Sequence, residues 1–108
     1  MFILGWVTVT ADADYGLYAL FHSSQFGSAG NRTFWATERL DELLDLGRST
    51  ADADQRLAYY HEAQEIIRDE APWIFLLITI EVNGTRDNIE GFVAHPAGHH
   101  RLFSVVKN

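Results

Sequence analysis

The sequence predicts a mixed α/β domain, because segments with helical spacing are flanked by short apolar runs that are typical of strands. Leucines recur at helical spacing in residues 38–48, and a longer pattern of the same kind covers 53–71. Continuous apolar runs occur at 2–4 and at 73–80, and strands covered on both faces have this composition. A chain of 108 residues is long enough for one hydrophobic core.

The composition excludes several classes of protein. An apolar fraction of 47% argues against disorder. A net charge of -7 without a basic stripe argues against a nucleic-acid partner. The chain has no cysteine, so disulfides and thiol chemistry play no part. Met1 is followed by neither a basic segment nor a small-residue cleavage site, so we expect no signal peptide in this chain.

The run from Phe2 to Phe21 carries most of the functional information. It begins as a strand, and Trp6 then presents a large flat face. In the extended segment that follows, Thr8 and Thr10 are expected on one side. A tryptophan beside hydroxyl groups can stack on a ligand that those hydroxyls orient. The alternative, that Trp6 is an ordinary core aromatic, stays open.

A polar turn follows, and its acidic residues have two interpretations. Asp14 is expected to cap a short helix that starts at Tyr15. Asp12 and Asp14 lie near the aromatic site, but turn formation and capping explain them better than catalysis. Without a nucleophile beside a base, the chain is predicted not to be an enzyme.

The loop at 22–32 is rich in serine and glycine, and Phe26 is its expected buried anchor. Asn31 can orient either this loop or a ligand. Phe34 and Trp35 follow. Either both are core residues, or one of the two lines a pocket.

Two helices should form an antiparallel pair that packs against a sheet. Thr37 is expected to cap the first helix, which should end at Gly47. Asp52 is expected to cap the second, and Pro72 to stop it. The second helix has one apolar face, made of Leu57, Tyr60, Ala63, Ile66 and Ile67.

The remaining third of the chain is predicted to be mainly β structure. Residues 73–80 should be a central strand, and Asn83-Gly84 is a turn signal. Two more short strands are expected at 89–94 and 102–106.

Three histidines between these strands raise the question of a metal. His95, His99 and His100 lie within six residues, but Pro96 and Gly98 indicate a turn in which three imidazoles rarely converge. We therefore predict neither a metal site nor a cofactor, and a metal-binding module is the third of our hypotheses.

The order of the motifs is more specific than any one of them. The segments LGW, TADADYGLYALFHSS, NRTFW, LDELLDLGR, DADQRLAYYHEAQEIIRDEAPWIFL and GFVAHPAG occur in this order. The chain resembles the C-terminal part of the family 5 extracellular solute-binding proteins, the peptide-binding receptors of ABC importers. Its clearest mark is the helix end at 69–73, and the WVTVTADAD stretch resembles the glutathione-binding and related short-peptide receptors.

The resemblance implies a two-lobed fold of the periplasmic-binding-protein type II class, present here as a fragment with a mixed sheet and a packed helix pair. Residues 1–80 would belong to the second, ligand-binding lobe, and 81–108 would cross back to the first. Strands without their partners would leave exposed edges, and the fragment could form a homodimer.

The resemblance also implies a function. It places Trp6 at the ligand cleft, with Thr8, Thr10, Asn31 and Trp35 as further candidates. Many members place an aspartate three residues after that tryptophan to pair with a peptide ammonium. Here that position is Val9, which puts recognition of a free peptide N-terminus in doubt.

The implied protein is an extracytoplasmic receptor that hands a short peptide or a glutathione-like solute to an ABC permease. The alternative is a stand-alone truncated domain that acts by oligomerisation.

Overall fold

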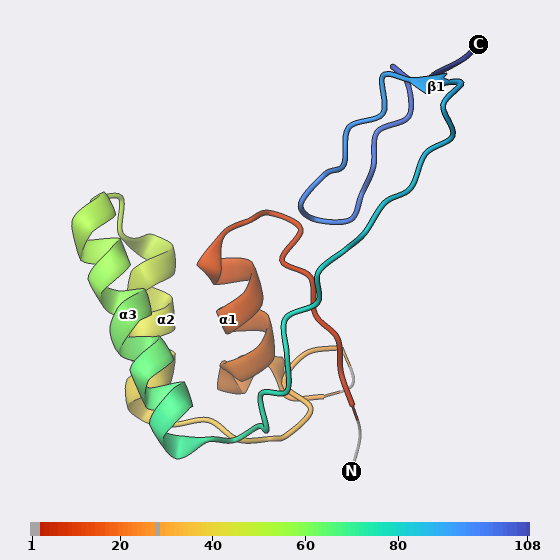
Figure 1. Ribbon diagram of the computed structural model, residues 1–108. Coiled ribbons are helices and arrows are strands. Elements are labelled where there is room, and N and C mark those ends of the chain that lie inside the picture. Colours follow the sequence, from red (N-terminus) through yellow and green to blue (C-terminus); the bar gives the residue numbers. More distant parts are fainter. Residues whose placement is uncertain (1–2, 28) are drawn as a thin grey trace. The chain divides into compact units, whose positions relative to one another are not determined.

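The computed structural model describes residues 3–27 and 29–108, in two compact units, Met1–Phe75 and Leu76–Asn108 (Figure 1). The first unit is helical, and its elements are α1 (Ala13–Phe21), the short 3-10 helix η1 (Ser23–Gln25), α2 (Glu38–Ser49) and α3 (Ala53–Glu70). The second contains two short strands, β1 (Ile89–Glu90) and β2 (Val106–Lys107). The α/β class is thus confirmed at the level of a helical unit and a two-stranded sheet.

The predicted start signals of α2 and α3 are confirmed. The Thr37 hydroxyl accepts a hydrogen bond from the Leu40 backbone N–H at 3.2 Å. The Asp52 carboxylate accepts one from the Gln55 N–H at 2.8 Å. Each bond satisfies a backbone donor that a helix start leaves without a partner. The end of α3 is also as predicted, because Ala71 takes a left-handed conformation immediately before Pro72.

The predicted end of α2 at Gly47 is wrong. The helix continues to Ser49, and the Thr50 N–H caps it by donating to the Leu46 carbonyl. Gly47 is buried inside the helix, where an added Cβ would lie 2.8 Å from Cζ of Tyr60. The glycine therefore makes room for an aromatic ring of α3, which is a packing role rather than a terminating one.

The core lies between the helices. Figure 1 shows α2 and α3 running antiparallel, as predicted, with α1 beside them. The fully buried residues of α2 are Leu40, Leu43 and Leu44, and α3 adds Tyr60, Ala63 and Ile67 while α1 adds Leu20 and Phe21. The described part of this unit contains no strand that could cover the pair, and α1 packs against α2 instead.

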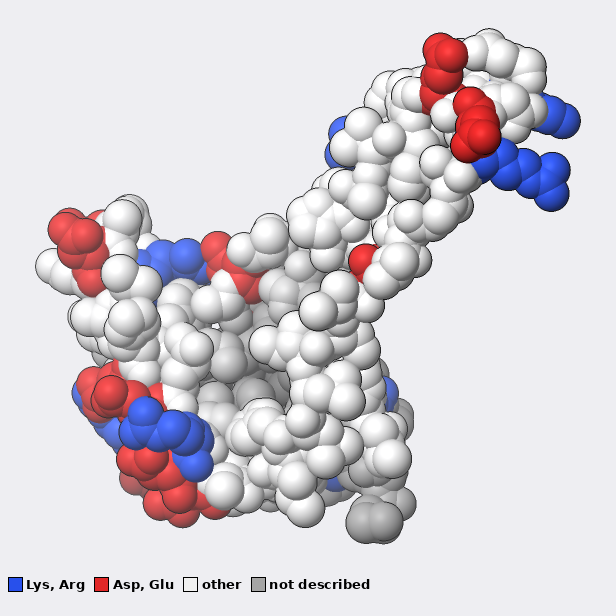
Figure 2. Space-filling model, in the orientation of Figure 1, with Lys and Arg blue, Asp and Glu red and all other residues white. Residues whose placement is uncertain are grey.

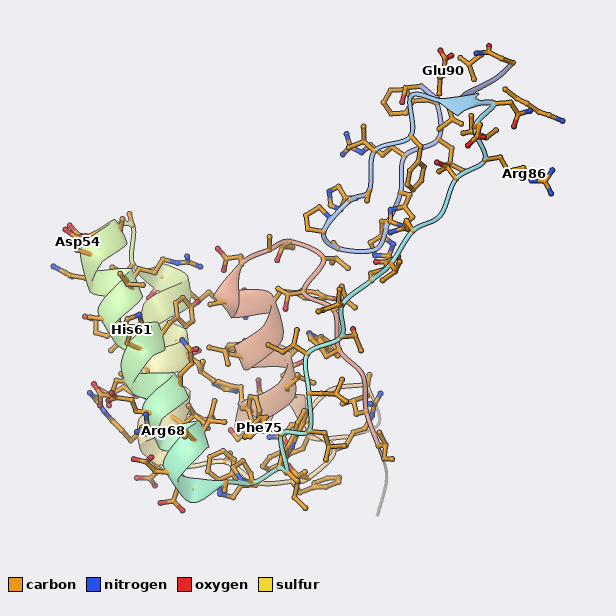
Figure 3. All side chains as sticks on the ribbon, in the orientation of Figure 1. Asp54, His61, Arg68, Phe75, Arg86 and Glu90 are labelled. Atoms are coloured by element: carbon orange, nitrogen blue, oxygen red, sulfur yellow. The ribbon has the colours of Figure 1, made fainter. Side chains whose placement is uncertain are left out.

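The apolar face of α3 is one turn shorter than its sequence pattern predicts. Leu57 is 57% exposed, and burial begins at Tyr60. Figure 3 shows Asp54, near the start of α3, pointing outward from the helix pair. The first turn of α3 thus lies largely in solvent.

The start of α1 also differs from expectation. The helix begins at Ala13, and Asp12 rather than Asp14 is its N-cap. Asp12 has an extended backbone, and its Oδ1 accepts from the Asp14 N–H at 2.9 Å. Asp14 lies in the first turn of α1, where its carboxylate pairs with Arg48 of α2. The prediction that Phe26 is a buried anchor of the loop after α1 is also wrong, because Phe26 is 44% exposed.

The two predicted apolar strands are absent from the described residues. Phe2 lies outside those residues, and Ile3 and Leu4 are not in a strand. Residues 73–80 are also not in a strand, and Ile78 is 98% exposed. Strands are stabilised by a hydrogen-bonded neighbour, and the described chain supplies none for either run.

The second unit is a narrow hairpin with less sheet than predicted. Ile89 pairs with Lys107 and Glu90 with Val106, so pairing covers a small part of 89–94 and 102–106. The turn before β1 is closed by the Ile89 N–H donating to the Arg86 carbonyl at 3.0 Å, so it lies after Asn83-Gly84.

No described helix is both long and apolar enough to span a membrane.

The exposure difference between two leucines is testable. Leu44→Ala removes a fully buried side chain, so we expect it to lower the free energy of unfolding by about 2–5 kcal/mol. Leu57→Ala, on the exposed start of α3, should cost less than about 1 kcal/mol. Urea denaturation of the 108-residue chain measures both values. Equal losses would contradict this description of the core.

Candidate functional site

The N-terminal segment lies against α1 through an aromatic pair. The rings of Trp6 and Tyr15 stack with centroids 5.5 Å apart and planes inclined by 29°. A Cβ at Gly16 would come within 3.1 Å of the Thr8 Oγ1 and 4.0 Å of the Trp6 Nε1. The bare backbone at Gly16 therefore lets the segment approach the helix, and it brings two of the predicted site residues together.

The indole of Trp6 is half-buried, and its N–H is unusual. Among the described residues, the Trp6 Nε1 is buried with no hydrogen-bond partner. A buried indole N–H ordinarily finds an acceptor, and leaving a donor unsatisfied is unfavourable. Trp6 packs against the core cluster, as the core interpretation expects, and its ligand role stays a prediction.

Thr10 lies at a shallow, open pocket beside this aromatic pair. The pocket has a volume of about 280 Å³ and is lined by Thr10, Asp12, Asp14, Tyr15, Arg48 and Arg56. Tyr15 belongs to both features, since it stacks on Trp6 and lines the pocket. Blue and red side chains lie side by side over the helical unit, as Figure 2 shows.

Two ion pairs join the start of α1 to the other helices at this pocket. Arg48, in the last turn of α2, donates from Nε and Nη2 to the two oxygens of Asp14 at 3.0 and 3.1 Å. Arg56, near the start of α3, donates from Nη2 to the Asp12 Oδ1 at 2.7 Å. Its Nε also donates to the Gly47 carbonyl at 2.9 Å. These pairs hold the polar turn in place.

The pairing changes the acid-base properties of its members. The hydrogen bond from Arg56 is the main reason that the pKa of Asp12 is below its ordinary value, with a smaller contribution from the Asp14 N–H. Hydrogen bonds to the two carboxylates raise the pKa of Arg48 and of Arg56. Burial raises the pKa of Tyr60, which lies next to Arg56. The lowered pKa of Asp12 and the raised pKa values of Arg48 and Arg56 keep these three groups charged at neutral pH.

The other two predicted site residues form a separate group. Asn31 is fully buried, and its Nδ2 donates to the Trp35 carbonyl at 2.7 Å. Its Oδ1 accepts from the Thr33 hydroxyl at 3.0 Å, and its backbone N–H donates to the Gln25 carbonyl at 2.7 Å. Trp35 is half-buried with its ring edge-on to Phe21. Asn31 thus organises its loop, and a ligand role for the pair stays a prediction.

The histidine loop has the features of a turn. The His95 N–H donates to the His100 Nδ1, and the Ala97 N–H donates to the His95 Nδ1, each at 3.1 Å. The His100 Nε2 lies 3.0 Å from a carboxylate oxygen of Glu81. Within residues 3–27 and 29–108, no three side chains of the metal-binding types gather as a metal site would require.

Sequence reasoning missed Tyr15, Gly16, Arg48 and Arg56 as parts of the site. Arg48 and Arg56 lie 34 and 44 positions from the aspartates that they bind. Their helical patterns place them on a polar face but do not say what that face meets. Gly16 could have been found from the sequence, because a glycine inside a predicted helix is unfavourable and therefore indicates close packing at that position.

The chain is similar in sequence to bacterial glutathione-binding proteins. It is 33% identical to the glutathione-binding protein GsiB of Escherichia coli (strain K12) over 97 residues, which is 89% of this chain and 19% of that protein. The proteins of the same name from Salmonella typhimurium (strain LT2) and Shigella dysenteriae serotype 1 are 34% and 33% identical over the same length. No protein-family model matches the chain.

The chain thus resembles the family 5 solute-binding proteins in sequence. The resemblance predicted from its motifs is thereby confirmed, and the relatives are named for binding rather than for a catalysed reaction. The chain spans about a fifth of the length of these relatives, as 19% of each is aligned.

The ion pair of Asp12 predicts an acid-dependent stability. Because folding lowers the pKa of Asp12 from 3.8, its stabilising effect is complete above that value and is lost as pH falls through the folded-state pKa. In the Asp12→Asn variant, the free energy of unfolding should fall less steeply between about pH 4 and pH 2. Urea denaturation across this range measures the slope.

A matched control is Asp69→Asn. Asp69 also has a lowered pKa, through its neighbour Arg68, but it lies on the surface of α3 with a side chain that is 68% exposed. Solvent weakens such exposed pairs, so this variant should leave the slope closer to that of the unmodified chain. The opposite ranking of the two variants would contradict the structural role of the Asp12–Arg56 pair.

Proposed function

We propose that this chain is the C-terminal part of an extracytoplasmic solute-binding receptor that delivers a short peptide or a glutathione-like solute to an ABC permease. The observation that carries the proposal is the stacked pair of Trp6 and Tyr15 beside a polar pocket. The similarity to proteins named for glutathione binding supports the same ligand class.

Each candidate residue has a part in the proposed site. Trp6 supplies stacking area, while the hydroxyls of Thr8 and Thr10 orient polar groups of the ligand. Trp35 supplies a second aromatic surface, and Asn31 holds the Trp35 backbone in place. Closure of a second lobe over this surface would trap the ligand.

We further propose the division of the chain that the resemblance implies, with 1–80 in the ligand-binding lobe and 81–108 returning to the other lobe. The exposed apolar run after Phe75 supports it. In this run Leu76, Leu77, Ile78, Ile80 and Val82 are each 67–98% exposed. Surfaces of this kind mark sites of association, and relatives five times as long provide segments to cover it.

A chimera tests the proposed function. This chain would replace the matched 97 residues of the Escherichia coli glutathione-binding protein, and glutathione would be titrated while tryptophan fluorescence is followed. We expect a saturable change in emission. A chimera that is folded by circular dichroism but gives no response to glutathione or to a panel of short peptides would overturn the proposal.

The role of Trp6 is tested in the same chimera. Trp6→Leu keeps an apolar side chain but removes the stacking face and the N–H, so the dissociation constant should rise by about tenfold or more. Phe34→Leu is the matched control, because Phe34 is an aromatic residue that is 65% exposed and has no assigned role. Equal effects of the two substitutions would remove Trp6 from the site.

One observation favours a second candidate function. The same exposed run could pair with a second copy of the chain, as in a stand-alone domain that acts by oligomerisation. Light scattering of the 108-residue chain separates the two. A stable dimer together with a chimera that binds nothing would favour this alternative.

A further inference from the structure

We propose that the pocket at the start of α1 is a subsite for a zwitterionic head group, in which an ammonium and a carboxylate are attached to the same carbon. This inference rests on the proposed function and names the part of the ligand that the pocket would take. Among glutathione-like solutes, the γ-glutamyl end has this chemistry. An ordinary α-linked peptide carries its two terminal charges at opposite ends.

The first reason is the balance of charge. The pocket is lined by two carboxylates, Asp12 and Asp14, and two guanidinium groups, Arg48 and Arg56. Their charges cancel, so a ligand with a single net charge would find no complementary field. A head group with one charge of each sign fits a neutral but strongly polarised pocket.

The second reason is the bonding capacity that the ion pairs leave unused. Both oxygens of Asp14 bind Arg48, and Asp12 uses Oδ1 for Arg56 and for the Asp14 N–H. Within the described part of the chain, the Asp12 Oδ2 and the Nη1 groups of Arg48 and Arg56 have no hydrogen-bond partner. One acceptor for an ammonium and two donor groups for a carboxylate thus remain at one pocket.

The third reason is the position and size of the pocket. A volume of about 280 Å³ is at or below the lower limit of the roughly 300–1,000 Å³ that holds a drug-sized molecule. The pocket therefore suits one end of a ligand. Tyr15 forms its wall and stacks on Trp6, so the rest of the ligand would continue over the aromatic face. Thr10 adds a hydroxyl at the rim.

Two isomeric tripeptides provide the sharpest test. Glutathione and α-glutamyl-cysteinyl-glycine have the same atoms and the same charges, but only glutathione has the zwitterionic head. We would titrate each into the isotope-labelled 108-residue chain and follow the side-chain Nε–H signals of Arg48 and Arg56 and the indole signal of Trp6 by NMR. Glutathione should shift all three signals, with at least about tenfold tighter binding than its isomer.

Two single-residue variants test whether glutathione binds at this pocket. Asp12→Asn keeps a good N-cap but removes the charge that would bind the ammonium, so it should weaken glutathione binding by about tenfold. Asp52→Asn makes the same change at the N-cap of α3, which does not line the pocket. This matched control should bind glutathione as the unmodified chain does.

The outcomes separate this inference from the proposed function. Equal binding of the two isomers, or equal behaviour of the two Asn variants, would overturn the zwitterion subsite while leaving Trp6 as a ligand contact. No shift at millimolar glutathione would also overturn the subsite, because all of its residues belong to this chain. The glutathione titration of the chimera would then decide the proposed function independently.

Discussion

The close contact between α2 and α3 is the interaction on which the rest of the helical unit depends. Leu40, Leu43 and Leu44 are fully buried in it, and burial of such apolar side chains is the dominant favourable contribution to folding. Gly47 continues this contact by leaving space for the ring of Tyr60. The packing brings the last turn of α2 next to the first turn of α3, and so places two arginines at one end of the pair.

The candidate site is built on that end. Arg48 and Arg56 reach from the helix pair to the polar turn before α1, and their partners Asp14 and Asp12 are thereby fixed. Exposed ion pairs contribute little to stability on average. Their effect here is positional, because the turn connects directly to the segment with Trp6. The residue that we propose to stack on a ligand is therefore held by contacts whose origin lies in the core.

The second unit, in contrast to the first, buries little apolar surface. Its sheet consists of two residue pairs, and the apolar run before it has little surface to pack against. An apolar run such as 76–80 is costly to leave in water, since each large apolar side chain gains on the order of 1.5–3 kcal/mol from full burial. Under the proposed function, such a run has a physical reason, because a segment that is apolar on both faces is suited to the interior of a larger sheet.

Local patterns in the sequence were enough to predict the caps at Thr37 and Asp52, the end of α3 before Pro72, the helix pair and the resemblance to solute-binding proteins. These follow from hydrogen bonds and periodicity within a few residues of one another. The packing of α1 on α2, the lack of strands in the described residues of the apolar runs and the pairing of Asp12 and Asp14 with arginines became visible only in the folded chain. Such contacts join residues far apart in the chain, and no local pattern specifies which distant surface a helix face or a strand edge will meet.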